Sequence, residues 1–405
     1  MIAAVRPSLS MWGGRVAQSV YRHAVLAPLI SGPVTSWLAP RRSRKGGHAA
    51  IRPVHFPQHG HGTLVLDRKQ ADAAGDLPHL ALRARARQRV VALDPQELDA
   101  ETIVALAAAG VPLELTTVPP DLEAHLGPQL SKLLVQHPIA DETGRELHSI
   151  RLRRAALPRY WHSLDGTEIR LPPISVLLAS RRPRALPAAI TQVAAQRGTD
   201  VQLVVGLHGP DWESSAEGTI ADRWAGPVVV VRAPDTDNLG EVLNELTRRS
   251  DGELVTKWDD DDWYGDEHLV DSALAYEYSG AELVGKAAEF VYLGASDRTV
   301  RRFATGAESF RWTIAGGTIL TSRAWLDSLG GWPRLPRGVD RGLLAATKRA
   351  GGQAYRTHGF QYVLRRDGRP GHSHTWSVDD EHFLSTSTLT RDGLDLQFAD
   401  IVTTS

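Results

Sequence analysis

The sequence of 405 residues contains no cysteine, and this absence excludes several kinds of site. A chain without thiols cannot form a disulfide scaffold, a thiolate metal centre or a cysteine nucleophile. Any metal must therefore be held by carboxylates, histidines or water. Such ligands favour a hard ion, Mn²⁺ or Mg²⁺, over structural zinc.

The chain also lacks a net charge of either sign and a long apolar run. Lysine and arginine number 46 against 47 acidic residues, so the formal net charge is −1 and predicts no nucleic-acid partner. No window reaches the roughly 18–20 uninterrupted apolar residues that a membrane span needs. The hydrophobic fraction of 42% is that of a globular protein, and the length predicts two or three domains.

Residues 1–48 are predicted to form an N-terminal arm that ends in a basic linker. Its apolar stretch, residues 16–39, lacks the compact core and cleavage site of a signal peptide, which predicts a cytoplasmic protein. A packing segment is the interpretation we favour. Peripheral contact with an anionic membrane is the alternative, because basic residues beside a partly amphipathic stretch are typical of membrane-surface segments.

Residues 49–168 are predicted to form a small α/β accessory domain. Short apolar runs predict strands at 62–67, 89–93 and 111–116, and a helix is expected over residues 94–108. This region contains no phosphate loop and no catalytic cluster. Its expected role is packing, partner binding or acceptor binding.

Residues 169–385 are predicted to form the main domain, and residues 386–405 a peripheral tail. Apolar strands and helices alternate in the main domain, with strands at 174–179, 201–207, 228–232 and 253–258 and helices at 186–196 and 238–250. This alternation predicts an α/β fold with a mostly parallel sheet and right-handed crossovers. Ligands of such sheets bind beyond the carboxyl ends of the strands.

Four consecutive aspartates, residues 259–262, follow the last of these strands directly. At about 4 Å and an effective dielectric constant of 20, each like pair costs on the order of 4 kcal/mol. A divalent cation with substrate phosphates offsets this repulsion. In an extended chain Asp259 and Asp261 face one side and Asp260 the other. A solvated acidic turn or a helix cap is the alternative interpretation.

The region from about residue 171 to residue 384 resembles the family 2 glycosyltransferases of the GT-A fold. The resemblance is carried, in order, by the strand ISVLLAS, the segment NLGEVLN with DGE, the run KWDDDD, and the motifs AGGT, LGGW and VD. It implies a GT-A fold, a nucleotide-diphosphate sugar donor and bound Mn²⁺ or Mg²⁺. One departure is that His208 stands where the family often has an acidic residue for the nucleobase.

The resemblance also implies roles for individual residues. Asp261 matches the metal ligand, Asp259 the residue that contacts the metal or the donor ribose, and Asp340 the general base. The expected donor-binding residues are Ala179, Ser180, Arg181, Asp259 and Asp260, with Lys286, Arg301 and Arg302 as candidate cations for the diphosphate. His374 is the candidate third metal ligand, and Gly316, Gly317, Thr318 and Trp332 are the candidate acceptor-binding residues.

For single residues, the alternative interpretation of Asp340 is a helix cap and that of Trp332 is a core residue. Two alternative functions are open as well. Together the residues predict a metal-dependent, inverting transfer of a sugar from a UDP-sugar to an acceptor hydroxyl. The acceptor is expected to be a glycan, a lipid-linked molecule or a small molecule, in cell-envelope glycan or glycoconjugate synthesis. The first alternative is a nucleotidyltransferase, although residues 180–183 lack the glycines of its phosphate loop. The second is a catalytically silent module that binds a nucleotide sugar.

Overall fold

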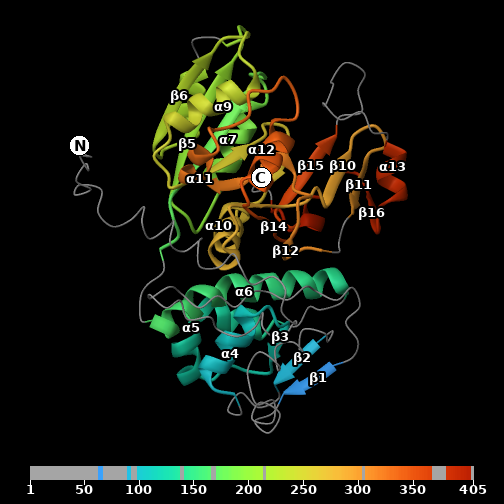
Figure 1. The fold of residues 1–405 in the computed structure, drawn as a ribbon. Helices are drawn as coiled ribbons and strands as arrows, with labels where there is room; N and C mark the ends of the chain where they lie inside the picture. The colour runs from blue at the N-terminus through green and yellow to red at the C-terminus, as the bar shows by residue number, and fades with distance from the viewer. Residues whose placement is uncertain are drawn as a thin grey trace, which may run out of the picture.

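The computed structural model describes residues 63–66, 89–92, 98–136, 141–165, 170–212, 216–302, 306–366 and 380–402. Figure 1 shows a smaller α/β unit below a larger one, with helix α6 running between them. The predicted N-terminal arm and His374 lie outside the described residues. None of the helices within these ranges is long and apolar enough to cross a membrane.

The smaller unit contains a parallel three-stranded sheet. The strands are β1 (Thr63–Leu66), β2 (Arg89–Ala92) and β3 (Leu113–Leu115), and the helices are α4 (Ala100–Ala108), α5 (Pro120–Leu134) and α6 (Glu142–Asp165). Asp99 caps α4 by accepting a hydrogen bond from the Thr102 amide at 2.6 Å. Gly110, at φ 79°, ends the turn after the helix, because this backbone conformation favours glycine.

The larger unit is built on an eight-stranded sheet with the order β12-β14-β9-β13-β7-β4-β5-β6. Its strands are β4 (Ile174–Ser180), β5 (Val201–His208), β6 (Val228–Ala233), β7 (Leu254–Trp258), β9 (Leu283–Gly285), β12 (Ser309–Phe310), β13 (Leu320–Ser322) and β14 (Ala354–Arg356). Strands β4, β5, β6 and β7 are parallel to one another, whereas β13 is antiparallel to both β7 and β9. The predicted α/β class with a mostly parallel sheet is therefore confirmed.

Helices cover both faces of this sheet. They are α7 (Leu186–Ala194), α8 (Ala216–Ala221), α9 (Leu239–Arg248), α10 (His268–Ser279), α11 (Arg323–Ser328) and α12 (Val339–Arg349). One apolar cluster joins α9, α11 and α12 to the sheet, and another joins α7 and α10 to it and to the smaller unit. Because both faces are covered, β4 and β7 are buried along nearly their whole length, as their continuous apolar runs predict.

A second, five-stranded sheet has the order β16-β11-β10-β15-β8. Its strands are β8 (Trp263–Tyr264), β10 (Phe290–Leu293), β11 (Arg298–Arg301), β15 (Tyr362–Arg366) and β16 (Leu389–Asp392), and α13 (Asp380–Ser385) precedes the last of them. The sequence predicts a peripheral tail over residues 386–405, and this is wrong for its described part. Strand β16 pairs with β11, and Ala399 and Ile401 are buried in an apolar cluster.

The order of the parallel strands creates a switch point. The chain proceeds outward from β4 through β5 to β6 and then returns to place β7 on the other side of β4. Leu178 of β4 pairs with Trp258 of β7, so both strands end at the same edge of the sheet. The crossovers leave this edge in opposite directions, which is the place where doubly wound sheets bind ligands.

Candidate active site

Two carboxyl strand ends meet at the switch point and are joined by polar contacts. Ser180 at the end of β4 donates a hydrogen bond to Asp260, which follows β7. Arg182 pairs with Asp260 and reaches the Asp261 carboxylate at 2.7 Å. The Asp260 side chain is only 3% exposed, whereas that of Asp261 is 20% exposed. Asp260 therefore fastens the aspartate run to β4, and Asp261 remains accessible.

Asp262 is also buried and has a structural role. Its carboxylate accepts hydrogen bonds from the Tyr362 hydroxyl at 2.7 Å and from the Arg365 amide at 2.9 Å. Both donors belong to β15, so Asp262 ties the aspartate run to the second sheet. The sequence allowed Asp262 as a cap of a following helix or turn, and these contacts explain its burial differently.

Asp259 and Asp340 are brought together by a lysine. The Nζ atom of Lys257 lies 2.5 Å from Asp259 Oδ1 and 3.8 Å from Asp340 Oδ1. The two carboxylates are 34% and 32% exposed, whereas the lysine side chain is 5% exposed. Lys257 thus offsets the negative charge of the two carboxylates from the buried side, while both aspartate side chains stay partly exposed. The alternation of side chains along β7 puts Lys257 on the same side as Asp259, and this signal was available in the sequence.

The neighbouring carboxylates raise the proton affinity of Asp259. Burial raises the pKa of Asp259, Lys257 opposes this rise, and the neighbouring Asp340 and Asp261 carboxylates raise the pKa further. A run of carboxylates that repel each other while two remain accessible is a donor set suited to a hard cation.

Asp340 lies in the first turn of α12, whose N-cap residue is Gly338. Asp340 is therefore not the helix cap that the alternative interpretation required. Its Oδ1 atom has no hydrogen-bond partner among the described residues, and its nearest cation is Lys257. That oxygen is buried, whereas the side chain as a whole is 32% exposed, so Asp340 still borders the open side of the site.

A glycine loop, Gly316–Thr318, closes the other side of the site. A Cβ atom at Gly316 would overlap the Asp340 carboxylate, and one at Gly317 would lie 2.6 Å from Asp259 Oδ2. Tyr264 fixes the loop, since its hydroxyl donates to the Gly317 carbonyl and accepts from the Asp259 amide, both at 3.0 Å. Only residues without a side chain at positions 316 and 317 allow this approach.

At the switch point, β4 ends with Ala179 and Ser180, and Arg181 follows directly. The Arg181 guanidinium reaches Asp235 Oδ1 at 2.6 Å and His208 Nδ1 at 3.2 Å. Burial lowers the pKa of His208, and Arg181 lowers it further. The neutral imidazole at the end of β5 therefore lies between β4 and β6, and Asp235, which follows β6, pairs with the same arginine.

Three predicted diphosphate cations face the interior, and their assignment is wrong in this structure. Lys286 is fully buried, and its Nζ donates to the His358 carbonyl at 3.2 Å. Arg301 is buried beside Glu289 and Glu146, and Arg302 is 3% exposed. Each is held by groups other than the aspartate run. The cations that do reach the run are Lys257 and Arg182, neither of which the sequence reasoning singled out.

Two predicted acceptor contacts are also interior. Trp332 is 1% exposed, and its indole nitrogen donates to Thr247 at 3.1 Å, so it packs in the core and cannot form a sugar platform. Thr318 is fully buried and accepts the Lys286 amide at 2.9 Å. It holds the glycine loop in place, and within the predicted set only Gly316 and Gly317 border the carboxylates.

The described residues contain no group of three or more histidine, aspartate or glutamate side chains that could hold a metal. Asp259 and Asp261 fit the smaller share of ligands that Mg²⁺ or Mn²⁺ takes from a protein when phosphates and water supply the rest. The predicted third ligand, His374, lies outside the described residues.

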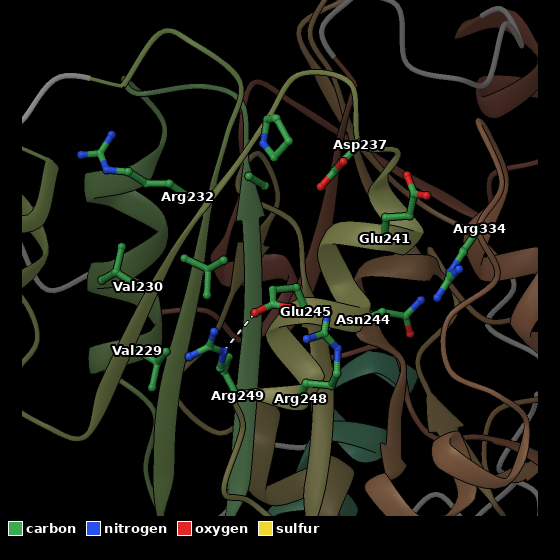
Figure 2. A pocket seen from close by; sticks show the side chains of 13 residues that line it. Val229, Val230, Arg232, Asp237, Glu241, Asn244, Glu245, Arg248, Arg249 and Arg334 are labelled. Atoms are coloured by element: carbon green, nitrogen blue, oxygen red, sulfur yellow. Dashed lines mark hydrogen bonds and ion pairs between the residues drawn. The ribbon is translucent and has the colours of Figure 1, made fainter.

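A separate cavity of about 680 Å³ opens between β6 and α9 (Figure 2). Its lining is mixed in charge, with Asp237 and Glu241 near Arg334, and Arg249 paired with Glu245 at 3.0 Å. None of the aspartates after β7 lines it, nor does Asp340. This cavity is therefore distinct from the carboxylate cluster.

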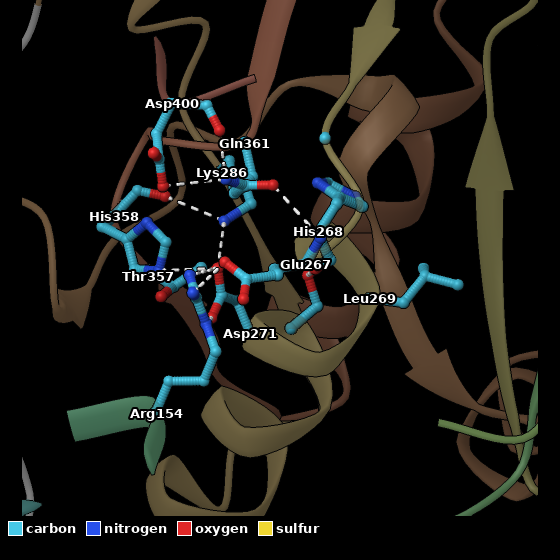
Figure 3. A network of polar contacts seen from close by, with 12 residues as sticks. Arg154, Glu267, His268, Leu269, Asp271, Lys286, Thr357, His358, Gln361 and Asp400 are labelled. Carbon is cyan, nitrogen blue, oxygen red and sulfur yellow. Dashed lines mark hydrogen bonds and ion pairs between the residues drawn. The ribbon is translucent and has the colours of Figure 1, made fainter. Parts of the chain in front are cut away.

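A polar network beneath the site joins the two units (Figure 3). Arg154 of α6 forms two hydrogen bonds to Asp271 of α10, at 2.7 and 3.0 Å, and also pairs with Glu267. Asp271 in turn lies 3.2 Å from His358 and 4.0 Å from Lys286. Arg154 of the smaller unit thus offsets the negative charge of Asp271 and Glu267 in the larger unit.

Comparison with known proteins finds no protein-family model and no curated protein that matches this chain. Among solved structures, the Pyrobaculum calidifontis mannosyltransferase PcManGT in complex with GDP-Man and Mn²⁺ aligns with 51% of this chain and 60% of its own at 18% identity and a TM-score of 0.37. S. aureus TarS 1–349 in complex with UDP aligns with 48% of this chain and 60% of its own at 15% identity and a TM-score of 0.38.

The same S. aureus protein in complex with UDP-GlcNAc aligns with 53% of this chain and 64% of its own, at 16% identity and a TM-score of 0.39. This chain therefore spans less than two thirds of each of these proteins. Likenesses of this size establish neither a family nor an activity, so the function has to come from the site itself.

Proposed function

We propose that this protein is a glycosyltransferase that moves a sugar from a nucleotide-diphosphate sugar to an acceptor hydroxyl. The observation that carries the proposal is the meeting of Asp259, Asp261 and Asp340 at the switch point, with Lys257 between two of them and a glycine loop closing over them. Two carboxylates that can hold a metal ion with the donor diphosphate thus lie beside a third carboxylate that can accept a proton.

The donor would bind across the ends of β4 and β7. The nucleotide would lie against Ala179, Ser180 and Arg181, with His208 and Asp235 next to them. Arg182 stands between this rim and Asp261 and can bind phosphate oxygens, because a guanidinium recognises them in a bidentate manner. A Mn²⁺ or Mg²⁺ ion would be held by Asp259 and Asp261 and would neutralise charge on the leaving diphosphate.

Asp340 would accept the proton of the attacking hydroxyl. Its side chain is 32% exposed, and the glycine at position 316 lets the loop pack against the carboxylate without displacing it. A general base positioned in this way lets the acceptor oxygen displace the diphosphate directly. A single displacement inverts the anomeric centre, so the product carries the opposite configuration to the donor.

The test combines donor binding with turnover. UDP- and GDP-sugars are screened with Mn²⁺ and Mg²⁺ by calorimetry, thermal stabilisation and release of the nucleotide diphosphate, since a ligand of the native state raises its stability. Asp261→Ala should weaken metal-dependent donor binding. The exposed Asp222 provides the matched control, Asp222→Asn, which should change neither measurement. Absence of nucleotide binding and of turnover across the panel would contradict the proposal.

The base assignment has its own variant. Asp340→Asn keeps the side-chain shape but removes the proton acceptor, so donor binding should persist while transfer falls by about 10²–10⁴-fold. Full transfer by this variant, with donor binding unchanged, would show that another group accepts the proton. A location in the cytoplasm, as the sequence predicts, completes the proposal, and peripheral membrane contact through residues 1–48 remains the alternative to a packing role for that arm.

A further inference from the structure

Basic residues are concentrated on the helix that carries Asp340. Between residues 333 and 350 the chain has five basic residues and a single acidic residue, Asp340 itself, although the whole chain is nearly neutral. Arg341, Ala345 and Lys348 are exposed and recur at the spacing of one helix face. Arg337, which precedes the N-cap residue Gly338, is exposed as well. We call Arg337, Arg341 and Lys348 the α12 basic stripe.

Within the described part of the chain, the α12 basic stripe has no acidic partner. None of its three side chains forms an ion pair with a carboxylate there, in contrast to the exposed Arg170 and Arg232. Two of its residues stand at the N-terminal end of α12, where the helix dipole disfavours cations. This placement does not stabilise the helix, and it leaves three cations available for a ligand.

An aromatic side chain faces the far end of the stripe. Trp312 is 36% exposed, and its ring centre lies 5.8 Å from Lys348 Nζ. Four residues later the same loop reaches Gly316, which touches Asp340. The loop and α12 therefore run side by side from Trp312 to the carboxylate. At a rise of 1.5 Å per residue, the eight residues between Asp340 and Lys348 span about 12 Å, which is longer than one sugar ring.

We infer that the acceptor is an anionic glycan, whose carboxylate or phosphodiester oxygens bind the α12 basic stripe and one of whose rings stacks on Trp312. Guanidinium and ammonium groups bind such oxygens, and an indole face binds the apolar face of a sugar. An acceptor held along α12 in this way presents a hydroxyl at Asp340. This inference rests on the proposed glycosyltransferase function and names its acceptor class.

The binding test uses the full chain and three fluorescently labelled polymers, namely oligogalacturonate, polyphosphate and neutral dextran. Fluorescence anisotropy should show salt-sensitive binding of at least one anionic polymer and none of dextran. The triple variant R337Q/R341Q/K348Q should bind about tenfold more weakly, because three exposed charge contacts are lost. Oligogalacturonate against polyphosphate identifies which oxyanion the stripe recognises.

The matched control R170Q/R223Q/R298Q removes the same total charge from exposed positions elsewhere in the larger unit. It should bind the anionic polymer within about twofold of the unmodified protein. Equal weakening in both triple variants would overturn the inference, because it would then reflect net charge alone. Binding of anionic lipid vesicles without binding of either soluble polymer would overturn it too.

Donor binding separates this inference from the proposed function. Calorimetry with UDP- and GDP-sugars does not involve the α12 basic stripe, so the triple variant should bind donor as the unmodified protein does. Intact donor binding with unchanged polymer binding in the triple variant overturns the acceptor class alone. A Trp312→Ala variant should weaken oligogalacturonate binding without changing its dependence on salt, and it should leave the binding of polyphosphate, which has no ring, unchanged; this result supports ring stacking.

Discussion

Replacing Arg154 by methionine tests the contact between the two units. Its guanidinium makes two hydrogen bonds to Asp271, and the two side chains are 9% and 3% exposed. Methionine keeps much of the side-chain volume but leaves the buried Asp271 carboxylate, among the described residues, with Lys286 and the imidazole of His358 as its remaining basic neighbours. Removing one partner of a buried pair costs about 3–5 kcal/mol, so R154M should lower the free energy of unfolding by this amount.

Arg151 on the same helix supplies the matched control. It pairs with Asp400, but its side chain is 39% exposed, and solvent screens such a pair. Arg151→Met should therefore cost about 1 kcal/mol or less. Equilibrium urea unfolding, followed by circular dichroism and tryptophan fluorescence, measures both variants. The double variant R154M/D271N should recover part of the loss, because it removes the uncompensated charge as well.

The effect of Arg154 should depend on pH in one direction. Burial alone would raise the pKa of Asp271, but Arg154 and then His358 hold it well below its usual value. The stabilisation is therefore fully present above the unfolded pKa, about 3.9, and is lost as the pH falls through the folded value. The difference between R154M and the unmodified protein should be constant from pH 6 to 8 and shrink below about pH 4. Equal losses for R154M and R151M would refute the reasoning.

The remaining predictions concern Gly316 and Lys286. Gly316→Ala should displace the Asp340 carboxylate and lower transfer by about tenfold or more, while donor binding is kept. The control is Gly218→Ala, where a Cβ meets nothing within 4 Å, and it should change neither transfer nor donor binding. Burial lowers the pKa of Lys286 from 10.5 to about 8. The unfolded chain binds more protons between these values, so stability should rise with pH by roughly 3 kcal/mol there, and Lys286→Met should abolish that rise in urea unfolding at pH 7.5 and 10. A rise that persists in the variant would assign it to other groups.

The parts of the fold that the sequence predicts are those controlled by local patterns. The continuous apolar runs of β4 and β5 indicate strands covered on both faces, and the structure covers them in this way. Asn238 predicts the start of α9, because it caps the helix together with Glu241. The same kind of local pattern predicts that the aspartate run directly follows a strand.

The errors concern residues whose surroundings come from distant segments. Arg301 belongs to a strand, but its partner Glu146 lies 155 residues earlier in the smaller unit. Trp332 follows two glycines that suggest an exposed loop, yet α9 supplies Thr247 for its indole nitrogen. Residue type and local pattern do not reveal such partners, because they depend on how α6 and α9 pack in the finished fold.

The reversed direction of β13 has a consequence for how this site can change. Because β13 is antiparallel to β7, its first residues, and not its last, lie at the edge where the aspartates stand, and the Lys257 amide bonds to the Ile319 carbonyl there. The glycine loop therefore enters the site from the chain segment before its strand. Insertions between β11 and β13 can reshape the surface beside Asp340 while β4, β5 and β7 keep their sequence. Selectivity on that side can thus diversify at little cost to the rest of the sheet.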